Sequence, residues 1–231
     1  MVALGTVAIL IATGVIWPNQ LWARGYEVRG VDVSSYQGTI DWNELASQDI
    51  DFAYIKSTEG SGDQDEYFAE NWKAAQRTGL LVGAYHFFSF ESPGETQAEN
   101  IISTVPKAAG ALPIVVDVEF YKNFAKNPPK RELVRSILDP LLQKLEAYYG
   151  VPPILYATET PYELYLSDAY PDNPIWIRNV ATPPTLSDGR AWTIWQFSNR
   201  DRLTGYSGKE EYIDMNVFDG SLDELKRLTT R

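Results

Sequence analysis

The chain has 231 residues, of which 44% are hydrophobic and 13% aromatic, and its formal net charge is -11. This length and apolar content suffice for one sizeable folded domain and exclude an intrinsically disordered chain. With no Cys and a single His, the sequence excludes a disulfide framework and argues against zinc sites and against Ser-His or Cys-His catalysis. The acidic balance argues against a nucleic-acid partner, because phosphates require a basic surface.

Residues 2–17 are uncharged and mostly apolar, and the next charged residue is Arg24. Such a segment predicts export or anchoring to the outer face of a membrane, with a buried core helix as the alternative. It is an atypical signal, because no Lys or Arg precedes it and no small-x-small cleavage site follows. Arg24 and Arg29 even oppose an outward-facing body under the positive-inside rule. We divide the chain into a signal or anchor over residues 1–24 and one domain over residues 25–231.

Short strand-like runs alternate with helix-like segments from residue 29 onward. The strands are predicted at residues 29–33, 52–56, 81–87, 112–118, 153–156, 175–178, 193–197 and 213–217. Helices are predicted at residues 64–77, 95–105 and 130–149, and short ones should begin at Asp41 and Thr160 because a Glu follows each three residues later. The last helix should kink at Pro140, end at Gly150 and bury the stripe Leu133, Ile137, Leu141 and Leu145.

This order predicts an α/β fold, a modified TIM-type barrel with about eight strands and about five helices, in which the later helices are lost. Active sites of such barrels lie at the carboxyl ends of the strands. That rule selects Asp32, Glu59, Tyr85, His86, Phe87, Asp117, Glu119, Tyr156, Arg178, Gln196 and Asp214, and Trp195 lies near the same rim.

Asp117 and Glu119 form the most informative pair among these residues. Alternate strand residues share a face, so their Cα atoms lie roughly 6 to 7 Å apart, which suits the paired carboxyl chemistry of sugar cleavage. Two solvated acids at a strand end are the alternative interpretation. Convergence with Asp32 and Asp214 would raise at least one carboxyl pKa by repulsion and keep that group protonated. Tyr85, Tyr156 and Trp195 are candidates either for stacking on sugars or for the edge of the core.

Several motifs together resemble glycoside hydrolase family 25, the bacterial and phage muramidases often called lysozymes. The resemblance covers about residues 28–218 in the expected order and implies a barrel that cleaves the β-1,4 bond after N-acetylmuramic acid in peptidoglycan. The motifs are GVDVSSYQG (30–38), IDW (40–42), YIKSTEG (54–60), GAYHFF (83–88), VDVE (116–119), WQF (195–197) and DMNVF (214–218).

The resemblance implies a role for each acid. Glu119 would be the general acid, Asp117 would orient the substrate's 2-acetamido group or attack the anomeric carbon, and Asp32 and Asp214 would hold hydroxyls and stabilise the transition state. We expect retention with acetamido participation, while a covalent enzyme intermediate and inversion stay open. Substrate contacts are expected from Tyr85, Tyr156, Trp195, Gln196, Glu59, Arg178 and His86, the last as a structural or substrate-contacting group.

The resemblance implies no cofactor and no metal, and we expect a monomer that acts on glycan strands of the cell wall. The sequence departs from many relatives at Ser35-Tyr36, where they have histidines, and at Ala157-Thr158, where they have Thr-Asn. Three alternatives remain: a related N-acetylglucosaminidase or chitinase-like glycosidase, a noncatalytic module that binds wall glycans, and a structural envelope protein.

Overall fold

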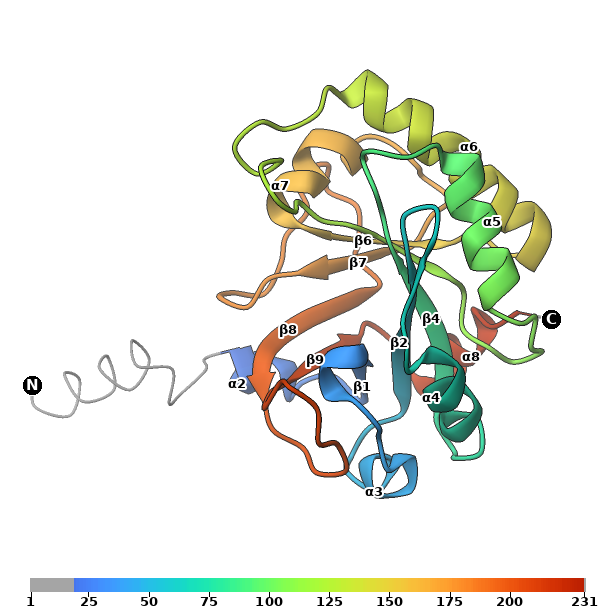
Figure 1. Ribbon diagram of the computed structural model, residues 1–231. Coiled ribbons are helices and arrows are strands. Elements are labelled where there is room, and N and C mark those ends of the chain that lie inside the picture. Colours follow the sequence, from blue (N-terminus) through green and yellow to red (C-terminus); the bar gives the residue numbers. More distant parts are fainter. Residues whose placement is uncertain (1–18, 231) are drawn as a thin grey trace, which may run out of the picture.

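The computed structural model describes residues 19–230, and its centre is a closed barrel of parallel and antiparallel strands (Figure 1). The pairing of β1 with β2 closes the ring, and β3 (Asp63–Gln64) adds a short hairpin to the end of β2. The barrel strands are β1 (Val28–Val33), β2 (Phe52–Glu59), β4 (Leu81–Phe87), β5 (Val115–Val118), β6 (Ile154–Thr158), β7 (Ile175–Arg178), β8 (Ile194–Asp201) and β9 (Ile213–Phe218). The predicted barrel of about eight strands is confirmed.

The last strand runs against its neighbours. Neighbouring strands from β1 through β2 to β8 are parallel, whereas β9 is antiparallel to both β8 and β1. The start of β9 therefore lies at the same end of the barrel as the carboxyl ends of the other seven strands. This reversal brings Asp214, the second residue of β9, to the end at which barrel enzymes carry their active sites.

Seven α-helices lie within residues 19–230, against about five predicted, because α2 and α8 add short helices to the flanks. They are α2 (Asn19–Ala23), α3 (Trp42–Ala46), α4 (Phe68–Ala75), α5 (Gly94–Thr104), α6 (Arg131–Tyr149), α7 (Glu159–Pro161) and α8 (Leu222–Arg227), besides the 3-10 turn η1 (Ser35–Gln37) and the π-helical turn η2 (Tyr162–Leu166). Loops join β7 to β8 and β8 to β9, so the predicted loss of later helices is confirmed.

Several predicted boundaries are wrong for identifiable reasons. The helix predicted from residue 64 begins at Phe68, because the Asp65 side chain accepts the N–H groups of Ser35 and Tyr67 and holds a turn. The strand predicted from residue 112 begins at Val115, after Pro113, which has no N–H to offer a ladder. The helix predicted to begin at Thr160 instead includes Glu159, and its N-cap residue has no side-chain cap.

The long helix α6 continues through Pro140 and ends at Gly150, which has a positive φ of 82°. Its predicted apolar stripe is correct at three positions, Ile137, Leu141 and Leu145, but Leu133 is 50% exposed. Val134 and Leu138 are buried in its place, so the buried face is rotated toward them. Figure 1 shows α5 and α6 side by side on one flank of the barrel.

Side chains alternate between the inside of the barrel and the layer beneath the helices. The interior at the closed end is filled by a cluster that includes Phe52, Tyr54 and Trp176. Gly30 and Gly83 leave room for the first two rings, because a Cβ on either would lie 2.5 or 2.2 Å from the ring of Phe52 or Tyr54. A second, larger cluster packs the outer faces of the strands against the helices. With one end filled, only the other end has room for polar inward side chains.

Residues 19–24, which the sequence places in the signal or anchor segment, include the helix α2 packed on the barrel. The side chain of Asn19 is buried, and Ala23 belongs to the outer core cluster. The rest of that segment, including residues 2–17, lies outside the described residues. Within residues 19–230, no helix is long and apolar enough to cross a membrane.

Candidate active site

A cleft of about 980 Å³ opens at the end of the barrel where β1 to β8 terminate. All four predicted catalytic acids line it, together with five of the seven predicted substrate contacts. These residues are Asp32, Asp117, Glu119 and Asp214, with Glu59, Tyr85, Tyr156, Arg178 and Gln196. Acids from three strands, β1, β5 and β9, therefore meet in one cavity.

Strand alternation explains which side chains reach the cleft. Asp117 lies two residues after the interior Val115, and Arg178 lies two residues after the interior Trp176. Trp195 and His86 occupy the opposite parity, next to inward-facing Gln196 and Tyr85. Neither of these two predicted contacts lines the cleft, and both side chains are fully buried.

Asp32 and Asp214 are directly opposite each other in the ladder between β1 and β9. The amide nitrogen of Gln196 donates to both carboxylates, at 2.9 Å to Asp32 Oδ1 and 3.2 Å to Asp214 Oδ2. Asn216 Nδ2 donates a further hydrogen bond of 2.7 Å to Asp32 Oδ1. Asp32 thus accepts hydrogen bonds from two side-chain amides, whereas Asp214 accepts a hydrogen bond from only one of them.

Two aromatic donors fix the orientation of these amides. The indole N–H of Trp176 donates to Asn216 Oδ1 at 2.9 Å, and the hydroxyl of Tyr156 donates to Gln196 Oε1 at 2.9 Å. Because each amide oxygen is engaged by a donor, each amide nitrogen is turned toward the carboxylates. The chain Trp176–Asn216–Asp32–Gln196–Tyr156 is therefore one continuous hydrogen-bond network.

The electrostatics of the pair favour one shared proton. Burial, followed by the charge of Asp32, raises the pKa of Asp214 to about 9. Burial also raises the pKa of Asp32, but the hydrogen bonds from Asn216 and Gln196 oppose that rise. Asp214 therefore carries the proton at neutral pH, and Asp32 is the carboxylate that accepts it in a hydrogen bond.

Asp117 and Glu119 lie at the end of β5. Burial and then the charge of Glu119 raise the pKa of Asp117 well above its usual range. Burial also raises the pKa of Glu119, while Arg178 and the Tyr156 hydroxyl, 3.4 Å from Glu119 Oε1, act in the opposite direction. Within the described part of the chain, Asp117 Oδ1 is buried without a hydrogen-bond partner. The two raised pKa values favour a proton shared within the pair, and Asp117 Oδ1 presents an acceptor that a ligand N–H or O–H can satisfy.

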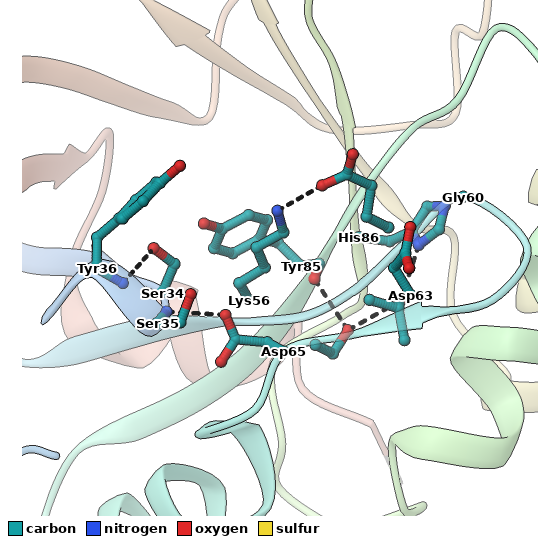
Figure 2. A network of polar contacts seen from close by, with 12 residues as sticks. Ser34, Ser35, Tyr36, Lys56, Gly60, Asp63, Asp65, Tyr85 and His86 are labelled. Carbon is teal, nitrogen blue, oxygen red and sulfur yellow. Dashed lines mark hydrogen bonds and ion pairs between the residues drawn. The ribbon is translucent and has the colours of Figure 1, made fainter. Parts of the chain in front are cut away.

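Charged side chains hold the rim of the cleft on the side of η1 and β2 in place (Figure 2). Lys56 Nζ forms an ion pair of 2.8 Å with Glu59, and Asp65 accepts the N–H of Ser35 at 2.8 Å. Tyr36, which follows in η1, lines the cleft and is 62% exposed. The position at which this chain departs from many relatives is therefore a rim aromatic that faces solvent.

His86 joins three elements on the outer side of the barrel, and Figure 2 shows it pointing away from the ring of Tyr85. Its Nε2 lies 2.9 Å from Gln97 Oε1 on α5, and its Nδ1 lies 2.8 Å from Thr58 Oγ1 on β2. Gln97 Nε2 donates to backbone carbonyls, so Gln97 Oε1 accepts from His86 Nε2–H and the Thr58 hydroxyl donates to Nδ1. Burial lowers the pKa of His86 to about 4, which makes it a neutral structural group.

Trp195 is also part of the outer layer. Its indole N–H donates to the carbonyl of Asn179 at 2.8 Å, and its ring packs edge-on against Tyr26 and Trp192. Of the two interpretations considered for this aromatic, the structure supports the core.

The sequence analysis missed several residues of the site. Trp176 and Asn216 are two positions from Arg178 and Asp214, so the same alternation that selects those residues would have found them. Lys56 follows the interior residues Phe52 and Tyr54 in the same way. The rim residues carry no such periodic signal, because they lie in loops, in the turn η1 or in β8 beyond its shift in register. They include Tyr36, Tyr121, Asn199, Arg200, Glu210 and Tyr212. Across residues 19–230, no group of three or more His, Asp or Glu residues is placed to hold a metal ion.

Comparisons with known proteins agree with this geometry. A family model described as glycosyl hydrolases family 25 matches residues 31–206. The structure of a family 25 glycosyl hydrolase from Bacillus anthracis is 56% identical, with a TM-score of 0.85 over 89% of this chain and 94% of that one. A bacterial lysozyme from Streptomyces coelicolor is 31% identical, with a TM-score of 0.79 over 87% of this chain and 96% of that one. Lysozyme M1 of Streptomyces globisporus is 30% identical over 211 residues, which cover 87% of this chain and 71% of the relative.

Proposed function

The chain belongs to glycosyl hydrolases family 25 and is therefore a glycoside hydrolase, and we propose that it is a muramidase. Its substrate would be peptidoglycan, cleaved at the β-1,4 bond between N-acetylmuramic acid and N-acetylglucosamine. The names of its relatives support this substrate, since two of those compared above are lysozymes. The observation that carries the proposal is the pair of buried Asp117 and half-buried Glu119, with raised pKa values and a free acceptor at Asp117 Oδ1.

In the proposed mechanism, Glu119 begins protonated and donates its proton to the glycosidic oxygen as the bond to the anomeric carbon breaks. Asp117 Oδ1 accepts the N–H of the 2-acetamido group and turns the acetamido oxygen toward that carbon. The acetamido oxygen attacks the anomeric carbon and a cyclic oxazolinium ion forms. Neither enzyme carboxyl group forms a covalent bond to the sugar. Glu119, now a carboxylate, takes a proton from the water that opens this ring.

Asp32 would stabilise the positive charge that develops on the sugar, because its carboxylate is held by the amides of Asn216 and Gln196. Asp214, protonated beside it, would donate to a sugar hydroxyl or to Asp32. Direct attack of Asp117 on the anomeric carbon would also retain configuration, whereas attack by water on the opposite face would invert it. The anomer first released, observed by proton NMR, separates inversion from the two retaining routes.

We further infer that the enzyme acts outside the membrane. A wall glycan is the substrate of this family's lysozymes, and residues 2–17 supply an apolar segment of the kind that exports or anchors a protein.

The test is mass spectrometry of fragments released from purified peptidoglycan by the full chain in mild detergent, with Glu119→Gln in parallel and chitin as a second substrate. Fragments with reducing-end N-acetylmuramic acid from the unmodified chain alone are expected. Reducing-end N-acetylglucosamine, or cleavage of chitin, would assign the chitinase-like alternative. Wall binding without any release by folded protein would assign the noncatalytic module.

A further inference from the structure

The described chain begins on the outer face of the barrel, beside strand ends whose neighbouring residues line the cleft. Asn19 Nδ2 donates to the carbonyls of Asn179 and Phe197, at 3.1 and 3.2 Å, and Gln20 donates to Asp201 at 3.1 Å. Asn179 follows the last residue of β7, and Asp201 is the last residue of β8. Figure 1 shows α2 beside the arrowhead of β8, which is the carboxyl end of that strand.

The contact at Phe197 also places this exit close to the reacting groups. Phe197 follows Gln196 in β8, and the Gln196 amide donates to Asp32 on the other face of the strand. With about 3.8 Å between successive Cα atoms, Asn19 lies roughly 15 Å from the Asp32–Asp214 pair. Asn199 and Arg200, which line the cleft, precede Asp201 directly.

The outer face of α2 is apolar and exposed. Leu21 is 63% exposed and Trp22 is 48% exposed, whereas Asn19 and Ala23 are buried against the barrel. One residue, Pro18, separates the pinned Asn19 from the uncharged run that ends at Trp17. A surface that holds this run as far as Trp17 would therefore lie against α2.

We propose that α2 rests on the surface of a lipid membrane that holds residues 2–17, with Leu21 and Trp22 in the headgroup region and the cleft mouth facing along that surface. The inference rests on the anchoring proposed above. Trp is the side chain that prefers this interface, and Leu beside it adds apolar area. The occupant is lipid because α2 continues directly from the apolar run.

The net negative charge of the chain determines which lipids α2 can bind. The net charge of -11 opposes adsorption to anionic lipid, so insertion of apolar side chains must supply the attraction. Contact is therefore expected on zwitterionic vesicles as well.

The short distance between α2 and the cleft also limits which glycan strands the enzyme can reach. From Asn19 back to Trp17 the chain adds at most about 7 Å, so with Trp17 at the membrane surface the catalytic acids would lie within roughly 20 Å of that surface. The enzyme would then cut the glycan strands nearest the membrane and not those deep in the wall.

The experiment uses the full chain in phosphatidylcholine vesicles, with lipids brominated near the headgroup or deep in the acyl chain as quenchers of Trp fluorescence. All proteins in this experiment carry Trp17→Phe, because Trp17 ends the apolar run and would itself be quenched at the membrane surface. Part of the remaining emission should be quenched by shallow bromine, and Trp22→Phe should remove that part. Leu21→Ser with Trp22→Ser should lose shallow quenching and cleave vesicle-tethered glycan more slowly, with activity on soluble glycan fragments unchanged. Leu133→Ser with Leu164→Ser, two exposed Leu residues outside α2, is the matched control.

Two results would overturn the inference in distinguishable ways. If the unmodified chain does not float with vesicles, the anchoring proposal fails and this inference fails with it. If the chain floats but Trp22→Phe leaves shallow quenching unchanged, the anchor stands and α2 does not touch the membrane. Activity on soluble fragments reports the muramidase proposal independently in both cases.

Discussion

Asp32 and Asp214 face each other across the antiparallel strand pair that closes the barrel, and one amide nitrogen, that of Gln196, donates to both. Two half-buried carboxylates that face each other in this way cannot both ionise at low cost. The amides single out Asp32 as the charged member, so the pair works as a carboxylate with a protonated neighbour. Its protonation has consequences for stability that can be measured.

Asp214→Asn should become more stable relative to the unmodified protein as the pH rises. The folded-state pKa of Asp214 is about 9, above its unfolded value near 3.9. The contribution of this group to the free energy of unfolding is therefore fully present below about pH 4 and is lost as the pH rises toward 9, with a limiting slope of about 1.4 kcal/mol per pH unit.

Urea denaturation of both proteins at several pH values between 5 and 9 measures this difference. Glu132→Gln, a change at an exposed position on α6, controls for the loss of a negative charge. Parallel stability curves for Asp214→Asn and the unmodified protein would contradict a raised pKa at this position.

Glu119→Gln should strongly slow hydrolysis of peptidoglycan while leaving the fold intact, because Gln has the shape of Glu and its amide N–H can donate to the Tyr156 hydroxyl oxygen. Loss of a general acid lowers the rate by about a hundredfold to ten-thousandfold. Aryl glycosides, whose leaving groups need no proton, should be affected much less. Equal losses on both substrates would assign Glu119 a role other than proton donation.

Trp176→Phe should lower kcat by releasing Asn216. The substitution removes the indole N–H that holds Asn216 Oδ1 and leaves that buried oxygen without its partner, at a cost of about 1–3 kcal/mol in stability. Asn216→Ala should lower kcat in the same way. If both act through Asp32, the double variant loses little more than either single one, and an additive loss in this cycle would refute the shared route.

Arg178→Gln should shift the basic limb of the pH profile of kcat/KM to higher pH. Arg178 lowers the pKa of Glu119, and the basic limb reports the ionisation of the general acid in the free enzyme. Removal of the charge therefore keeps Glu119 protonated to a higher pH. Arg178→Lys retains the charge and should leave the limb near its original position; an unmoved limb in Arg178→Gln would show that Arg178 has no electrostatic role.

His86→Ala should destabilise the protein by about 2–4 kcal/mol with KM unchanged, because the ring joins Thr58 and Gln97 outside the cleft. The pKa of His86 is lowered to about 4, so its contribution to stability is present above about pH 6.5 and is lost as the pH falls through 4. Tyr85→Phe, the neighbouring position that lines the cleft, should instead alter KM. A rise in KM for His86→Ala would return His86 to the substrate contacts.

The sequence predicts the barrel and the acids of the cleft well, because strands and their carboxyl ends leave a two-residue pattern and a positional rule. The same pattern, applied strictly, separates inward Gln196 from outward Trp195 and inward Tyr85 from outward His86. Asn216 belongs to the pattern but lacks the ionisable group that draws attention to Asp214.

Other features leave no local signal. Strand direction is decided by loop length and by which edges remain unpaired, so the reversal of β9 is not visible in residues 213–217. The helix α2 directly follows an apolar run in the sequence, so the sequence predicts it as part of that run, although Asn19 donates to the carbonyls of Asn179, just after β7, and Phe197 in β8. Rim side chains such as Tyr36 are placed by contacts between loops, for example the N–H of Glu210 donating to the Tyr36 carbonyl.

The bond between Asn216 and Asp32 joins residues 184 positions apart in the chain. A polypeptide that emerges from the ribosome or crosses a membrane amino end first exposes β1 long before β9. Until β9 follows, Asp32 lacks its opposite acid and the sheet has an unpaired edge on each side of the gap. The cluster of acids is thus completed last, and a chain that ends before β9 lacks both Asp214 and Asn216.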